Sequence, residues 1–106
     1  MIDTFLSGVG FQVVLANGGE DAIEAFKKMP RIPDLVLTDV VMPGMSGPML
    51  VDRLLALNPE IRVLFMSGYD ERQVVQRYVV EKRFHLIAKP FSFKDLQAAI
   101  IAALAD

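Results

Sequence analysis

Three polar residues stand where an apolar run of strand length ends. Asp39 follows the run LVLT, Ser67 follows VLFM and Lys89 follows LIA. A carboxylate can attack a phosphoryl donor to give an acyl phosphate, an ammonium group pairs with a phosphoryl oxygen as a compact charge, and a hydroxyl donates a hydrogen bond. The three residue types together predict an anion-receiving site built around the Asp39 carboxylate.

Each of these residues also has a simpler interpretation when it is taken alone. An aspartate after a strand is most often a turn or cap residue, a serine before glycine usually belongs to a loop, and a lysine before proline is usually a solvated charge. These interpretations weaken because all three residues follow apolar runs. If the runs are parallel strands, their carboxyl ends share one edge of a sheet, and the three side chains converge there.

Four apolar runs would form the strands that position these residues. None of the runs alternates between apolar and polar residues, which is typical of parallel strands buried on both faces. The expected strands are residues 11–16, 34–38, 62–66 and 85–88.

Segments with apolar residues at helical spacing separate the runs. The expected helices are residues 1–6 (as part of a helix), 20–29, 48–58, 70–80 and 92–104. Strands that alternate with helices predict an α/β fold with an open, doubly wound parallel sheet in three layers. In such a fold, the ligand crevice lies at the carboxyl ends of the strands.

Composition narrows the classes of function. The chain has 106 residues, 53% of them hydrophobic, with a formal net charge of -2, which predicts one domain over residues 1–106 and no general attraction to nucleic acid or anionic membrane. It has no cysteine and one histidine, which excludes disulfides, thiolate zinc sites and clusters of histidine ligands. No signal peptide or membrane-spanning run is present, so we expect a soluble cytoplasmic protein.

Three stretches of the sequence carry a family resemblance. Residues 34–47 read DLVLTDVVMPGMSG, residues 65–68 read FMSG and residues 88–91 read AKPF. In this order they resemble the phosphoacceptor strand and loop, the hydroxyl-bearing strand end and the lysine-proline turn of response regulator receiver domains in two-component signalling. The MSGY stretch is most similar to receivers fused to hybrid histidine kinases. The resemblance implies a flavodoxin-like fold and a signalling module rather than an enzyme.

The resemblance also implies roles for individual residues. Asp39 would accept a phosphoryl group from the phosphohistidine of a histidine kinase or a histidine phosphotransfer protein, and Lys89 and Ser67 would bind the phosphoryl oxygens. Mg²⁺ would be held by the Asp39 carboxylate and the backbone carbonyl of Val41. The Lys89–Pro90 bond would be cis.

The N-terminal region departs from the receiver pattern. Receivers begin with a central strand that ends in an acidic pair, and counting back from Asp39 places that pair before Met1. Three explanations stay open: a shortened piece or misassigned start, a natural receiver with a rearranged sheet, or a second chain that fills the gap. We expect either direct pairing between the strands at 11–16 and 34–38 or a homodimer that closes the gap, because open edges invite pairing.

The missing acidic pair also leaves a choice between functions. Asp39 and the Val41 carbonyl alone predict weak Mg²⁺ binding and slow phosphorylation of these 106 residues. The alternative function is a receiver-like interaction module that is not phosphorylated. A phosphatase with an aspartyl-phosphate intermediate, of the haloacid-dehalogenase type, is disfavoured because that type usually has a second aspartate where Val41 stands here.

Overall fold

A three-stranded parallel sheet forms the centre of the computed structural model, which describes residues 2–68 and 70–105 without the side chains of residues 72–74. Strands β1 (Val36–Asp39), β2 (Val63–Ser67) and β3 (His85–Ala88) lie in the order β1-β2-β3. Val36 pairs with Val63 and Leu64 pairs with His85, so the strands run in register toward one edge. Met1, Tyr69 and Asp106, which the sequence places in the expected domain, lie outside the described residues.

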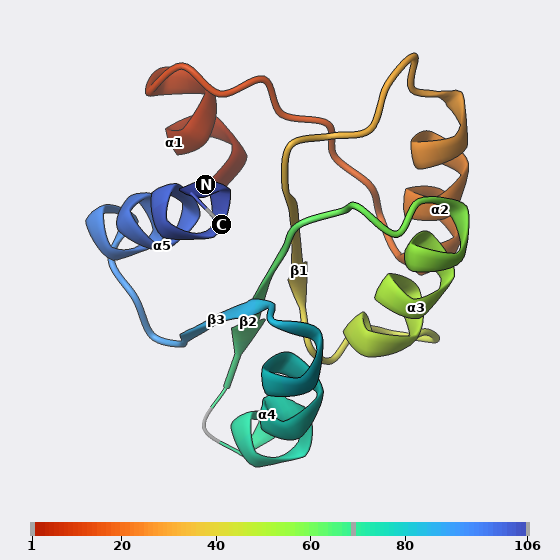
Figure 1. The fold of residues 1–106 in the computed structure, drawn as a ribbon. Helices are drawn as coiled ribbons and strands as arrows, with labels where there is room; N and C mark the ends of the chain where they lie inside the picture. The colour runs from red at the N-terminus through yellow and green to blue at the C-terminus, as the bar shows by residue number, and fades with distance from the viewer. Residues whose placement is uncertain (1, 69, 106) are drawn as a thin grey trace.

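Helices cover both faces of this sheet (Figure 1). Helices α1 (Ile2–Gly8) and α5 (Phe93–Ala105) lie on one side, and α2 (Gly19–Lys28), α3 (Gly47–Leu57) and α4 (Glu71–Lys82) lie on the other. Each side has its own apolar core, one around Phe65 and Leu54 and one around Leu64 and Leu96. The expected three-layer, flavodoxin-like α/β architecture is confirmed.

Local capping explains where two of the helices begin. The Ser46 hydroxyl accepts a hydrogen bond from Met49 N–H at 3.2 Å, which satisfies a free donor at the start of α3. At α5, Asp95 N–H donates to Ser92 Oγ at 3.0 Å and Ser92 N–H donates to Asp95 Oδ2 at 3.3 Å. This reciprocal pair is a capping box, and each predicted helix lies within two residues of an observed one.

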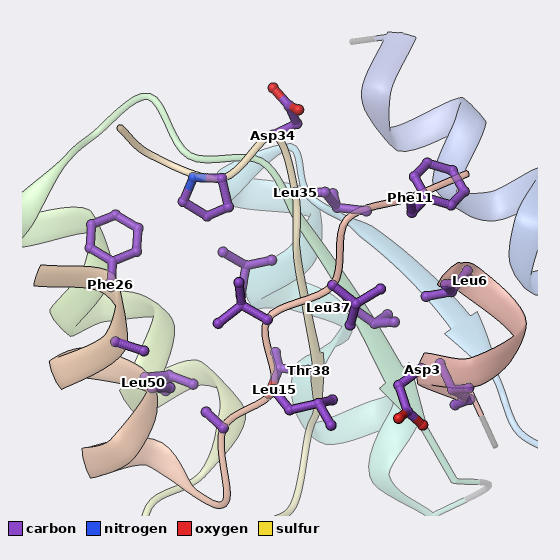
Figure 2. A pocket seen from close by; sticks show the side chains of 18 of the residues that line it. Asp3, Leu6, Phe11, Leu15, Phe26, Asp34, Leu35, Leu37, Thr38 and Leu50 are labelled. Carbon is purple, nitrogen blue, oxygen red and sulfur yellow. The ribbon is translucent and has the colours of Figure 1, made fainter. Parts of the chain in front are cut away.

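The prediction of a strand at residues 11–16 is wrong. Phe11 N–H bonds to the Leu6 carbonyl at 3.0 Å, and the segment then runs on without joining the sheet of the described residues. Phe11 and Val13 pack against the core shared by α1 and α5, and a cavity lined by residues 11–16 separates this segment from β1 (Figure 2). An apolar run forms a strand only where a neighbouring backbone lies within hydrogen-bonding distance.

Direct pairing between residues 11–16 and the strand at 34–38 is therefore also wrong. The first hydrogen bond of this strand to its neighbour is made by Val36 N–H, which donates to the Arg62 carbonyl at 2.9 Å. This explains why β1 begins at Val36 rather than at Asp34. The homodimer stays a prediction. In the part of the chain that the structure describes, no helix is both long and apolar enough to span a membrane.

Candidate functional site

The three strands end at a common edge of the sheet. Asp39 is the last residue of β1, Ser67 is the last residue of β2, and Lys89 directly follows β3. The register pairs Asp39 with Met66 and Ser67 with Ala88, and Lys89 N–H donates to the Ser67 carbonyl at 2.8 Å. The predicted convergence of the three residues is confirmed at the level of the backbone.

An ion pair joins two of the predicted side chains. Lys89 Nζ lies 2.6 Å from Asp39 Oδ1, and the two side chains are 43% and 40% exposed. This distance is short for a charge-assisted hydrogen bond. Partial exposure leaves the Asp39 carboxylate open to an incoming group, and it also lets solvent screen the attraction within the pair. The Lys89–Pro90 peptide bond is cis, as expected.

The Ser67 side chain lies deeper than the ion pair. It is fully buried, and its Oγ has no hydrogen-bond partner among the described residues. An unsatisfied buried hydroxyl costs about 1–3 kcal/mol, so its presence calls for an explanation. The structure therefore brings Asp39 and Lys89 together by their side chains, whereas Ser67 joins them through its backbone.

A close backbone contact fixes the turn that follows Asp39. Gly47 N–H donates to the Val40 carbonyl at 2.8 Å, and a Cβ atom on Gly47 would collide with the Asp39 carbonyl oxygen. The Thr38 hydroxyl, on a 5% exposed residue, donates to the same Asp39 oxygen at 3.0 Å. Only glycine lets α3 begin so near the acceptor strand.

Sequence reasoning included Gly47 in the loop motif but missed this packing role. The signal available was a glycine between the Ser46 cap and Pro48, at the start of a helix that follows the loop. Its contact with the Asp39 carbonyl depends on how closely α3 approaches β1, and one-dimensional spacing does not give that distance.

The described residues do not by themselves fit a magnesium site. They contain no cluster of three or more histidine, aspartate or glutamate side chains that could hold a metal ion. Mg²⁺ takes near-octahedral oxygen ligands, commonly including one or two carboxylates. Asp39, one of the expected ligands, is paired with a cation, and the expected Val41 carbonyl is a single neutral ligand.

Comparison with known proteins identifies the family. The sequence profile of the response regulator receiver domain matches residues 1–101. The chain belongs to the receiver domain family of two-component response regulators. Receiver domains are in general signalling modules, and as a family they typically bind Mg²⁺.

Individual relatives agree with this assignment. The chain is 35% identical to the sensor kinase CckA of Brucella abortus over 90% of its length and 10% of that protein. It is 36% identical to the transcriptional regulatory protein ZraR of Escherichia coli O157:H7 over 99% of its length and 23% of that protein. The chain thus spans less than a quarter of either relative.

A solved structure shows the same fold. The receiver domain of NtrX from Brucella abortus superposes with a TM-score of 0.85 at 25% identity. The match covers 98% of this chain and 87% of that one. The flavodoxin-like receiver fold is therefore shared, while part of the solved domain has no counterpart in these 106 residues.

Proposed function

We propose that Asp39 is the phosphoacceptor of this receiver and takes its phosphoryl group from a histidine kinase or a histidine phosphotransfer protein. The observation that carries the proposal is the 2.6 Å pair between Lys89 Nζ and Asp39 Oδ1 at the carboxyl edge of the sheet. This pair puts a nucleophilic carboxylate beside a fixed positive charge at a partly exposed position. Residues at this edge of an open α/β sheet commonly contact the ligand.

The transfer is a displacement at phosphorus. An Asp39 carboxylate oxygen attacks the phosphorus of the donor phosphohistidine, the bond from phosphorus to the imidazole nitrogen breaks, and the electron pair of that bond returns to the ring. When the second ring nitrogen of the donor carries a proton, the ring leaves as neutral imidazole, and the products are a mixed anhydride on Asp39 and a neutral donor histidine. Catalysis of such a step depends on positioning and on stabilisation of the oxygens that bear the charge.

Lys89 and Ser67 supply that stabilisation. The Lys89 ammonium already lies against the carboxylate, so it can transfer its contact to a phosphoryl oxygen once the anhydride forms. The Ser67 hydroxyl has no partner among the described residues, so it is available to donate a hydrogen bond. A phosphoryl oxygen would satisfy this buried donor.

Mass spectrometry of the intact protein tests the assignment. After incubation with a phosphorylated histidine phosphotransfer protein, we expect the mass of one added phosphoryl group, which hydroxylamine removes. Asp39→Asn should abolish the addition. Asp34→Asn is the matched control, since Asp34 lies exposed two residues before β1 begins, away from the edge that carries Asp39. Labelling that survives Asp39→Asn would refute the assignment.

The ion pair between Lys89 and Asp39 also favours a second function. Because Lys89 pairs with Asp39 and no metal cluster occurs among the described residues, these residues could act as an interaction module without phosphorylation. Such a module would bind its partner equally well as the natural chain and as Asp39→Asn. A partner affinity that changes on phosphoryl transfer and not in Asp39→Asn would decide for the phosphoacceptor.

A further inference from the structure

The backbone N–H that follows Ser67 is held by a side chain rather than by the sheet. Gly68 N–H donates to Glu71 Oε1 at 3.0 Å, in a partly buried contact. Glu71 N–H donates in return to the Gly68 carbonyl at 3.2 Å. The carboxylate of the first residue of α4 thus folds back onto the end of β2, beside the residue that carries the buried hydroxyl.

The hydrogen bonds of β2 show which way this N–H faces. The Met66 carbonyl accepts from Val40 N–H at 3.1 Å, on the side of β1. The Ser67 carbonyl accepts from Lys89 N–H at 2.8 Å, on the side of β3. Because successive residues of a parallel strand bond to opposite sides, the alternation directs Gly68 N–H back toward β1. This donor therefore faces the strand that ends in the proposed phosphoacceptor.

The next acceptor along β1 is already in use. In a continued parallel ladder, Gly68 N–H would donate to the Val40 carbonyl. Gly47 N–H donates to that carbonyl at 2.8 Å, because the chain turns there into α3. The Glu71 carboxylate supplies the acceptor in its place. A hydrogen bond to a carboxylate is about twice as strong as one between neutral groups, so the replacement is a firm one.

Three donors at this edge of the sheet could stabilise a phosphoryl group, and carboxylates already occupy two of them. The Lys89 ammonium pairs with Asp39, and Gly68 N–H bonds to Glu71. The hydroxyl of Ser67 has no partner among the described residues. A phosphoryl group on Asp39 would bring about two negative charges to the same edge, and like charges at one site disfavour each other. The Glu71 carboxylate thus holds a place that the phosphoryl oxygens would compete for.

We propose that the Glu71 carboxylate is an internal competitor of the phosphoryl group for Gly68 N–H, and that phosphorylation of Asp39 displaces it. This inference rests on the proposed function of Asp39 and adds a regulatory residue to that site. Before transfer, Glu71 withholds one donor from the site and slows phosphorylation. After transfer, a phosphoryl oxygen accepts from Gly68 N–H, and the Glu71 side chain turns away from the new negative charge.

The contacts of α4 determine what this displacement changes. The buried side chains among those described in α4 are Val75 and Val79, and Tyr78 OH donates to Asp52 of α3 at 2.7 Å. These contacts anchor the helix beyond its first turn. Glu71 ties the first turn to the end of β2 (Figure 1). Release of Glu71 therefore loosens the start of α4 while the rest of the helix stays in place, which turns a local charge change into a structural one.

Rates of phosphoryl transfer provide the first test. The natural chain, Glu71→Gln and Glu71→Ala are incubated with a phosphorylated histidine phosphotransfer protein, and mass spectrometry follows the labelled fraction. Both variants should be labelled about threefold to tenfold faster, because glutamine keeps the acceptor oxygen without its charge and alanine removes both. Glu81→Gln is the matched control, since Glu81 lies exposed on the same helix and pairs with Arg77. It removes the same charge and should leave the rate unchanged.

A residue that only caps α4 would behave differently. Glu71→Gln would then keep the natural rate, and Glu71→Ala would lower the thermal unfolding midpoint without faster labelling. Unchanged or slower labelling of a folded Glu71→Gln chain overturns the proposal. Equal acceleration by Glu81→Gln also overturns it, because the effect would then come from net charge and not from the contact with Gly68.

Titration with inorganic phosphate tests the competition without any covalent transfer. In Asp39→Asn the acceptor side chain is neutral, so a phosphate ion can approach Lys89 and the donors beside it. The amide resonance of Gly68 reports whether the ion reaches this N–H. We expect phosphate to shift this resonance, with a dissociation constant about threefold or more lower in Asp39→Asn combined with Glu71→Gln than in Asp39→Asn alone.

The two tests separate this inference from the proposed function. If neither the natural chain nor any variant takes a label, the proposed function fails, and the phosphate titration alone decides whether Glu71 competes for Gly68 N–H. A Gly68 resonance that phosphate does not move, or equal dissociation constants with and without Glu71→Gln, overturns the competition even in a chain that is labelled normally on Asp39. Faster labelling together with tighter phosphate binding in the Glu71 variants supports it.

Discussion

Residues 11–16 and strand β2 are both short apolar runs, yet only β2 is part of the sheet. All five residues of β2 are buried, and β1 and β3 pair with it on its two sides. In the N-terminal run, Val14 and Leu15 are mostly exposed. The difference teaches that an apolar run supplies the side chains for a strand, whereas backbone neighbours decide whether the strand forms.

The largest expected effect is a loss of stability in the core around β2. Phe65 is fully buried and packs edge-on against Tyr78 and Phe84. Phe65→Ala should lower the free energy of unfolding by about 3–5 kcal/mol, because the deletion leaves a cavity in the core. Urea unfolding followed by circular dichroism measures this. Val14→Ala is the matched change in the other region and should stay within about 0.5 kcal/mol. Similar losses for both variants would contradict the contrast between the two regions.

Gly47 and Gly8 extend the comparison to the backbone, because Gly47 packs against the sheet whereas Gly8 precedes the N-terminal apolar run. A Cβ atom on Gly47 would meet the Asp39 carbonyl, whereas one on Gly8 would meet nothing within 4 Å. Gly47→Ala should destabilise the chain by about 1–3 kcal/mol through overpacking. Phosphoryl transfer to Asp39 should also slow, because the turn after the acceptor must move. Gly8→Ala should be neutral or stabilising by up to about 1 kcal/mol. Thermal unfolding and the labelling assay read out both variants, and normal labelling of Gly47→Ala would show that the turn tolerates displacement.

The affinity for Mg²⁺ tests whether the 106 residues form a complete metal site. With one carboxylate that is already paired, the 106-residue chain should bind Mg²⁺ weakly and be labelled slowly by acetyl phosphate. Titration calorimetry and mass spectrometry measure the two quantities, and a chain lengthened at its N-terminus to include an acidic pair should recover both. Tight Mg²⁺ binding by the short chain, lost in Asp39→Asn, would mean that other groups complete the site.

Five helices and three of the four strands could be predicted from the sequence, because the spacing of apolar residues there agrees with the local structure. The site could be predicted to the same extent, since the convergence of Asp39 and Lys89 follows from parallel strands that end at one edge. The failure at residues 11–16 has a specific cause: apolar periodicity does not report the absence of a pairing partner. The burial of Ser67 Oγ and the approach of Gly47 to Asp39 were missed because both depend on distances between elements.

A tyrosine gives a smaller, pH-dependent effect. Tyr78 OH donates to Asp52 Oδ1 at 2.7 Å, which joins α4 to α3. Burial, followed by the hydrogen bond and the charge of Asp52, raises the pKa of Tyr78 above its ordinary value of 10.0. A raised pKa in the folded state means that this contribution to stability is present below about pH 10, where tyrosine is also neutral in the unfolded chain, and is lost as the pH rises further.

Tyr78→Phe tests this contribution. Loss of the hydrogen bond should cost about 0.5–1.5 kcal/mol at neutral pH. The difference in unfolding free energy between the natural chain and Tyr78→Phe should shrink above about pH 10. Urea unfolding at several pH values measures the difference, and a gap that widens in alkali would mean that the pKa is lowered instead.

The smallest expected effect in the 106-residue chain concerns Leu15, and it sharpens the comparison between the regions most directly. Leu15 and Val80 are each 68% exposed. Leu15→Ser and Val80→Ser should therefore both change the unfolding free energy by no more than about 0.5 kcal/mol. If a strand of a lengthened chain pairs with β1 on the side away from β2, Leu15 becomes buried, and Leu15→Ser should then cost about 1.5–3 kcal/mol while Val80→Ser stays neutral. Equal small effects in both chains would mean that Leu15 remains at the surface, and that residues 11–16 are a connection rather than a strand without its neighbour.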